Sequence, residues 1–145
     1  MQRQEIRKVL AEKGNVVHYI SPEASVAEAV RRMNDHHVGS LLVIDAGTLL
    51  GIFTERDVLV RVVDKGLDPR ATLVEDVMTD ELITVSPNTI VHEAMHIVTR
   101  RRCRHLPVVE HGEVIGVISI GDLTRWMVRD QRDMIEYLER YITTG

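Results

Sequence analysis

Apolar residues along the first half of the chain change their spacing from the period of a helix to the period of paired strands. A helix is predicted after Ser21-Pro22, because apolar residues follow at i, i+3, i+4 and i+7: Val26, Ala29, Val30 and Met33. The runs LLVI (41–44) and LLGIF (49–53) come next and flank a turn with Gly47, which predicts two paired strands. A second helix is predicted to begin near Asp57.

The same order of patterns returns 65 positions later, where residues 81–123 align with residues 16–58 without a gap. Residues identical in the two copies include Ser21, Pro22, Val26, Glu28, Ala29, Leu41, Val43, Gly47, Gly51 and Asp57, which match residues from Ser86 to Asp122. Such self-similarity marks one supersecondary unit that has been duplicated. The predicted fold is α/β (α+β), with two β-α-β-β-α repeats.

The repeats and their flanking segments divide the chain into five parts. We expect an N-terminal helix over 1–15 that stops at a glycine, repeat 1 over 16–63, a connection with one helical turn over 64–80, repeat 2 over 81–128, and a C-terminal helix over 129–145. The first strands of the repeats are predicted at about Val17–Ile20 and Ile83–Val85. Each is expected to end at a Ser-Pro pair, because proline lacks an N–H donor.

Composition narrows the classes of function. The net charge of −4 gives no general attraction to nucleic acid or anionic membranes, and aromatic residues make up only 3% of the chain. No apolar run approaches the ~20 residues of a membrane span, and no secretory signal is expected. Cys103 is the only cysteine, which excludes an internal disulfide. These features predict a cytoplasmic protein without a membrane or nucleic-acid partner.

The stretches GIFTERD (51–57) and GVISIGD (116–122) carry the candidate chemistry. In each, a hydroxyl residue precedes an aspartate by three positions, as Thr54 precedes Asp57. This spacing is that of a helix capping box, and taken singly most such matches are only that. The alternative is a ligand site, since a hydroxyl beside helix N–H groups can hold a phosphate or sugar oxygen and an ionised aspartate can accept two vicinal hydroxyls. The residues alone leave both readings open.

The chain resembles the tandem CBS-domain pair, often called a Bateman module. The resemblance is carried by GIFTERD, GVISIGD, RHLPVVEHGEVIG (104–116) and DVMT (76–79), and it covers nearly the whole chain. It implies two repeats related by a pseudo-twofold axis, two clefts between them, and ligands that contain adenosine: AMP, ADP, ATP, NAD or S-adenosylmethionine. It also implies a free-standing homodimer that has no catalytic role and signals ligand occupancy to another protein, whose identity is unknown.

The family's binding residues can be carried over by position. Asp57 and Asp122 would bind ribose hydroxyls, and Thr54 and Ser119 would contact ribose or phosphate. Adenine contacts would come from the first strands and from the entries to the second strands: His18, Tyr19, Ile83, Thr84, Val38, Gly39, Cys103 and Arg104. Basic residues there would contact phosphate, and the repeats differ, because Arg104 and His105 stand opposite Gly39 and Ser40, and Arg56 opposite Gly121.

Two other motifs suggest rival functions. HEAMH (92–96) matches the HExxH signature of zinc proteases, but repeat 1 has AEAVR at the same place and no third metal ligand is evident. The basic run Arg100–Arg104 could bind nucleic acid, although a solvated helix end is the commoner meaning. Neither a nucleophile with its base nor a metal cluster is seen. The resemblance to CBS domains implies a regulatory, energy- or redox-sensing module that binds AMP or a related nucleotide, and we expect no catalytic cofactor and no metal.

Overall fold

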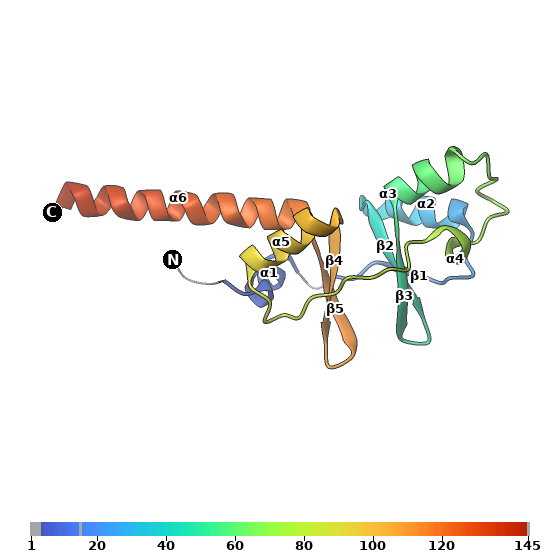
Figure 1. Cartoon of the computed structure of the whole chain (residues 1–145), viewed down its shortest axis with the longest axis horizontal. Coiled ribbons are helices and arrows are strands. Elements are labelled where there is room, and N and C mark those ends of the chain that lie inside the picture. Colours follow the sequence, from blue (N-terminus) through green and yellow to red (C-terminus); the bar gives the residue numbers. More distant parts are fainter. Residues whose placement is uncertain (1–3, 15, 145) are drawn as a thin grey trace. The chain divides into compact units, whose positions relative to one another are not determined.

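The computed structural model describes residues 4–14 and 16–144, and the side chains of these residues except at 134, 137 and 141–144. The chain forms two compact units, one of residues 16–83 and the other of residues 1–15 together with 84–145 (Figure 1). Each unit combines a small sheet with helices, so the predicted α/β class is confirmed.

The unit of residues 16–83 contains the first repeat and the segment predicted as a connection. Its elements are β1 (Tyr19–Ile20), α2 (Val26–His36), β2 (Ser40–Asp45), β3 (Thr48–Thr54), α3 (Glu55–Asp57), the π-helix η1 (Val58–Val63) and α4 (Val74–Val77). The sheet has the order β1-β2-β3, with β1 parallel and β3 antiparallel to β2. The predicted second helix is thus a single α-turn that continues as a π-helix.

Local chemistry explains where these elements begin and turn. The Ser25 hydroxyl accepts a hydrogen bond from the N–H of Glu28, which caps the start of α2. Ala46 and Gly47 both have positive φ, as a two-residue hairpin between β2 and β3 requires. The apolar faces of α2 and the sheet meet in a core whose largest fully buried members include Ile20, Leu41 and Phe53.

The second unit contains α1 (Ile6–Lys13), α5 (Val91–Arg101), β4 (His105–Glu110), β5 (Glu113–Ser119) and α6 (Ile120–Thr144). Strands β4 and β5 pair antiparallel. Helix α6 continues from the repeat into the C-terminal segment without a break, and its far end extends beyond α1 and α5 (Figure 1).

The predicted first strands need correction. In repeat 1 the strand covers only Tyr19–Ile20. In repeat 2 the predicted strand at Ile83–Val85 is wrong, because among the described residues Val85 alone pairs with β4, by one parallel bridge to Val108. The reason is Pro107: its counterpart in repeat 1, Leu42, donates its N–H to the carbonyl of His18 at 3.0 Å, and proline has no N–H to donate.

Helix α1 packs on the second repeat, although it directly precedes the first. The N–H of Ile6 donates to the carbonyl of Thr89, and the N–H of Val91 donates to the carbonyl of Gln4. Leu10 lies against Gly116 of β5, where an added Cβ would lie 2.6 Å from its side chain. In the other unit α4 and Thr79 cover β3 in a similar way, since Thr79 pairs with Ile52. Each hairpin is therefore covered by a segment that precedes a repeat.

Candidate functional site

The hydroxyl and the aspartate of GIFTERD bond to each other at the end of β3. The Thr54 hydroxyl accepts from the N–H of Asp57 at 3.2 Å, and the Asp57 Oδ2 accepts from the N–H of Thr54 at 3.0 Å. Asp57 is only 5% exposed. The reciprocal bonds form a capping box at the start of α3, so the structural reading of this spacing is confirmed.

The second copy has the same geometry. The Ser119 hydroxyl accepts from the N–H of Asp122 at 3.0 Å, and the Asp122 Oδ2 accepts from the N–H of Ser119 at 2.8 Å. Asp122 is 9% exposed. Both aspartates therefore lie at the junction of a strand and a helix, beside the N–H groups that begin the helix.

The two carboxylates differ in their remaining partners. Asp57 Oδ1 accepts from the Thr79 hydroxyl at 3.0 Å and lies 3.6 Å from the Arg61 Nε. Asp122 contacts two cationic groups: Lys13 Nζ donates to its Oδ2 at 2.6 Å, and Arg125 Nη2 donates to its Oδ1 at 2.7 Å. The sequence motifs did not predict these basic residues as part of the site: Lys13, Arg61 and Arg125.

Burial and hydrogen bonding act against each other on Asp122. Burial raises the pKa of the carboxyl, but the hydrogen bonds from Lys13 and from the N–H of Ser119, with the charge of Lys13, outweigh it and leave the pKa lowered. Asp122 is therefore ionised near neutral pH. An ionised carboxylate is a hydrogen-bond acceptor only, which is the form needed to bind hydroxyl groups.

The entry to the second strand of each repeat lies beside the capped helix. The N–H of Glu55 donates to the carbonyl of Gly39 at 3.1 Å, and Ser40 pairs with Thr54. In the second repeat the N–H of Ile120 donates to the carbonyl of Arg104 at 2.8 Å, and His105 pairs with Ser119. Most of the predicted residues within a repeat thus gather at one end of its sheet.

The predicted site residues of the first strands differ in how they are placed and exposed near this end of each sheet. The carbonyl of His18 bonds to β2, and Tyr19, in β1, has an exposed side chain. Thr84 is exposed and directly precedes the bridging residue Val85, whereas Ile83 is the last residue of the other unit and is half-buried.

Charge at the strand entries differs between the repeats. At Gly39 the carboxyl group of Glu55 fills the space beside the backbone, since an added Cβ would lie 3.3 Å from it. Val38, the preceding residue, is half-buried, and Arg56 is exposed. Arg104 is exposed, and no described residue bonds to its guanidinium group. The end of repeat 2 therefore presents a cation where that of repeat 1 presents a carboxylate.

Two further predicted residues have altered acidity. The His18 ring stacks on His36 with centroids 4.4 Å apart, and burial, followed by the charge of His36, lowers the pKa of His18. Cys103 is half-buried, and this burial raises the pKa of its thiol despite a backbone hydrogen bond and the charge of Arg101. A thiol in this state is a poor nucleophile.

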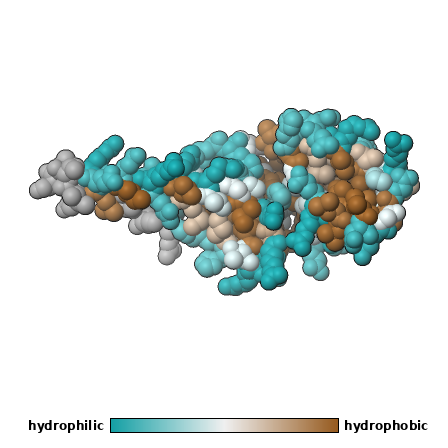
Figure 2. Space-filling model, turned by 90° about the horizontal axis from the view of Figure 1, so that it is seen from above, coloured by the Kyte–Doolittle hydropathy of each residue, from teal (hydrophilic) through white to brown (hydrophobic). Residues whose placement is uncertain are grey.

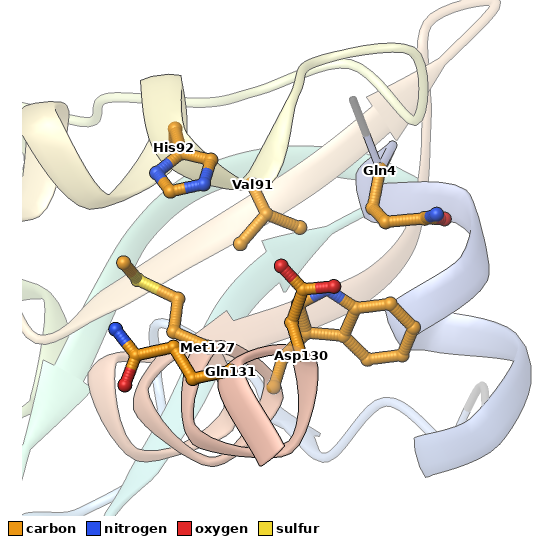
Figure 3. Close-up of a pocket in the computed structure, with 7 residues that line it drawn as sticks. Gln4, Val91, His92, Met127, Asp130 and Gln131 are labelled. Atoms are coloured by element: carbon orange, nitrogen blue, oxygen red, sulfur yellow. The ribbon is translucent and has the colours of Figure 1, made fainter. Parts of the chain in front are cut away.

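A depression on the second unit lies apart from these residues (Figure 3). Its walls come from the chain before α1 and from α5 and α6: Gln4, Val91, His92, Trp126, Met127, Asp130 and Gln131. Its volume of about 30 Å³ is far below the ~300 Å³ of a small ligand pocket. It is too small for a nucleotide, and none of the predicted binding residues lines it.

The HExxH motif gains no support. His92 and His96 are exposed on α5. Across residues 4–14 and 16–144, no three histidine, cysteine, aspartate or glutamate side chains gather in a group that could hold a metal ion. A zinc hydrolase needs three protein ligands and an open position.

Comparison with known proteins identifies the family. The CBS domain model matches residues 7–64 and 74–129. The chain belongs to the CBS-domain family. The matched regions begin before the repeats predicted from the alignment of the two halves, and they take in α4 and all of α1 except Ile6.

Similar CBS-domain proteins come from plants and bacteria. The mitochondrial CBS domain-containing protein CBSX3 of Arabidopsis thaliana is 40% identical over 88% of this chain, and the match spans 64% of that protein. The CBS domain-containing protein YhcV of Bacillus subtilis is 34% identical over 72% of this chain and 74% of its own length. Thus the chain spans less than two thirds of the plant relative.

Solved CBS-domain structures have the same fold. A CBS-domain protein from Agrobacterium tumefaciens matches with a TM-score of 0.82 at 35% identity, over 86% of this chain and 99% of that one. A CBS-CP12 protein from bloom-forming cyanobacteria, which is hexameric, matches with a TM-score of 0.77 at 25% identity, over 86% of this chain and 68% of that one. Among the described helices, none combines the length and the apolar composition of a membrane span.

Proposed function

We propose that this CBS pair is a regulatory module that binds adenine nucleotides and signals their presence to another protein. The observation that carries the proposal is the pair of buried aspartates, Asp57 and Asp122, each held beside a hydroxyl at a strand–helix junction. A carboxylate fixed in this way accepts vicinal hydroxyls, as on a ribose, and the adjacent Thr54 and Ser119 suit ribose or phosphate oxygens. AMP is the first candidate, with ADP, ATP and NAD as alternatives.

The proposed adenine contacts are His18, Tyr19, Val38 and Gly39 in one repeat, and Thr84, Cys103 and Arg104, with Ile83 before them, in the other. The exposed Arg104, with His105 beside it, supports a phosphate contact in the second repeat, and Arg56 supports one in the first. The aspartates bind and orient the ligand without catalysing a reaction, and we propose a non-enzymatic protein.

We also propose that two copies of the chain form a homodimer through their helices. Each unit carries exposed apolar side chains on helices: Leu59, Val60 and Val63 on η1, and Val128, Ile135 and Leu138 on α6. Figure 2 shows apolar side chains gathered over the first unit and along α6. Exposure of these apolar side chains to water is unfavourable, and packing against a second copy would bury them.

The regulated partner is a different protein in this proposal, and ligand binding would act on it by favouring one arrangement of the module over another. A cytoplasmic location remains a prediction, because one relative is mitochondrial. The run Arg100–Arg104 lies at the solvated end of α5, which gives no reason to prefer nucleic acid as the ligand.

A thermal-shift panel tests the function. The protein is unfolded, dialysed and refolded to remove any ligand carried through purification, then heated with AMP, ADP, ATP, NAD, GMP or IMP. A ligand present at about 100 times its dissociation constant stabilises the fold by ~2.7 kcal/mol, which raises the Tm of a domain of this length by roughly 10 °C. We expect adenine nucleotides to raise Tm more than GMP or IMP.

Asp57→Asn provides the matched variant, because the amide oxygen of asparagine can still accept from the N–H of Thr54 but is the only acceptor oxygen that the side chain has. We expect it to bind AMP more weakly than wild type while losing little stability, and 2′-deoxy-AMP to be less affected. Asp64→Asn, a neutralisation of an exposed aspartate just after η1, is the control. The proposal fails if millimolar adenosine compounds move the Tm of no variant, wild type included.

A further inference from the structure

The carboxylate of Asp122 is nearly saturated with donors. A carboxylate has about four acceptor positions, two on each oxygen. Oδ2 accepts from the N–H of Ser119 and from Lys13 Nζ, and Oδ1 accepts from Arg125 Nη2. One position remains. A ribose that presents two hydroxyl groups needs two, one on each oxygen.

Asp57 has the capacity that Asp122 lacks. Its Oδ2 accepts from the N–H of Thr54, and its Oδ1 accepts from the Thr79 hydroxyl. The Arg61 Nε, at 3.6 Å, is beyond hydrogen-bond distance. One position therefore stays open on each oxygen, so Asp57 can accept a diol without losing any of its bonds.

Of the two cations on Asp122, Lys13 is the more firmly placed. Its Nζ also donates to the carbonyl of Val117 at 2.6 Å, and its side chain is 37% exposed, whereas that of Arg125 is 73% exposed. Lys13 is the last residue of α1, which is fixed to the same unit by the Arg7–Glu110 ion pair and by Leu10 against Gly116. Arg125 can turn into solvent at little cost, so Lys13 decides whether the carboxylate opens.

We propose that Lys13 is a selectivity residue of the Asp122 site, an inference that rests on the proposed function. Lys13 holds the acceptor position that a ribose hydroxyl needs. An uncharged nucleoside must displace the ammonium group and leaves it without a partner of opposite charge. A nucleotide brings a phosphate that can receive the displaced ammonium, so the charge-assisted bond is exchanged instead of lost. The Asp122 site therefore discriminates against adenosine, and the Asp57 site does not.

Calorimetry with adenosine and AMP tests the proposal in an Asp57→Asn background, which weakens the other aspartate site. Lys13→Met keeps the length of the side chain and removes the ammonium group. We expect adenosine to bind roughly tenfold or more tightly than in the parent, because a competing charge-assisted hydrogen bond has been removed. The ratio of AMP affinity to adenosine affinity should fall by at least the same factor. Lys8→Met is the matched control, since Lys8 lies on the same helix over Trp126.

The other possible outcomes contradict either the role of Lys13 or the proposed function. Unchanged or weaker adenosine binding in Lys13→Met, with AMP binding intact in the parent, overturns the role of Lys13 and leaves the proposed function standing. If wild type and all variants bind neither compound, the proposed function fails and the inference with it. An equal gain in Lys8→Met means that the net charge of α1 matters, which also overturns the specific role of Lys13. Lys13→Gln, which keeps a neutral donor, replaces Lys13→Met if that variant does not fold, and a smaller gain in adenosine affinity is then expected.

Discussion

At the scale of single residues, the capping-box geometry at Asp57 and Asp122 is compatible with the proposed ribose contact. The capping box needs a hydroxyl followed three residues later by a carboxylate, and these bonds are present in both repeats. The same bonds fix the carboxylate in place and use only part of its acceptor capacity. The structural and the ligand-binding readings of the motif are therefore compatible, and a residue can cap a helix while it binds a ribose.

Arg104 provides a test of phosphate recognition. Its guanidinium is exposed and unpaired among the described residues, while its carbonyl is tied to Ile120 beside Ser119. A hydrogen bond to a charged group contributes about 1.5–3 kcal/mol, or roughly ten- to a hundredfold in affinity. We expect Arg104→Ala to weaken AMP by about that factor, and to change adenosine binding little, as measured by calorimetry.

Arg101→Ala is the control for this variant, because Arg101 is an exposed arginine in the last turn of α5. Similar losses for AMP and adenosine in Arg104→Ala would assign Arg104 a role in shaping the site. A loss of AMP affinity as large in Arg101→Ala would point to the general positive charge of this helix end instead.

The sequence could predict the motif residues but not all their partners. Thr54, Asp57, Ser119 and Asp122 are recognisable because each lies at a strand–helix junction and recurs after 65 residues. Thr79 carries a weaker signal, as the end of DVMT. Lys13 carries none, since it precedes Asp122 by more than a hundred residues and nothing in its surroundings marks it.

At the scale of elements, Gly51 and Gly116 occupy equivalent positions in the two repeats, and neither has a positive φ. Both are explained by the close approach of neighbouring atoms, which leaves little room for a side chain. A Cβ at Gly51 would lie 2.7 Å from both the Met78 sulfur and the backbone carbonyl of Thr79. A Cβ at Gly116 would lie 2.6 Å from Leu10, but only from its side chain. A leucine terminus can change rotamer, whereas the carbonyl of Thr79 is bonded to the N–H of Ile52.

We therefore expect Gly51→Ala to destabilise the fold by about 1–3 kcal/mol, the usual cost of overpacking, and Gly116→Ala to cost less. Urea unfolding of the two variants beside wild type measures both free energies. Gly47 is not a suitable control because its φ is positive. Equal costs would mean that the packing of Leu10 is as rigid as the backbone at Thr79, contrary to this account.

Most elements could be predicted from periodicity and turn residues, and the errors have identifiable causes. The strand at Ile83–Val85 fails because Pro107 cannot donate to it, a relation between segments that no local pattern contains. The helical turn expected within residues 64–80 is present as α4, but the local pattern did not show that α4 packs on the first repeat through Val74 and Val77, which are buried. Whether a helical turn packs back on the preceding sheet depends on tertiary contacts, and local propensity does not decide it.

At the scale of the whole molecule, α6 offers an exposed surface for the proposed homodimer. The helix has 25 residues, of which Trp126, Met127, Asp130 and Gln131 line the depression shared with α5. From Arg132 to Arg140 every described side chain is exposed, and these include Ile135 and Leu138. The last turns of α6 therefore gain no stabilisation from packing on their own unit, and a second copy of the chain would supply a packing surface in the proposed homodimer.

Charge placed on the exposed apolar face of α6 should separate the two copies. Val128 and Ile135 lie seven residues apart and so share a face, while Asp133, two residues from Ile135, lies on the other side. We expect Ile135→Glu to convert a species of twice 16.5 kDa into one of 16.5 kDa in sedimentation equilibrium, because an unpaired carboxylate in an apolar interface costs several kcal/mol. Asp133→Lys should leave the mass unchanged. Far-ultraviolet circular dichroism should show a loss of helix in Ile135→Glu, since the freed end of α6 loses its support.

A wild-type mass of 16.5 kDa at all concentrations would rule out the homodimer. An Ile135→Glu variant that stays dimeric would place the interface elsewhere, with the exposed residues of η1 as the next to test.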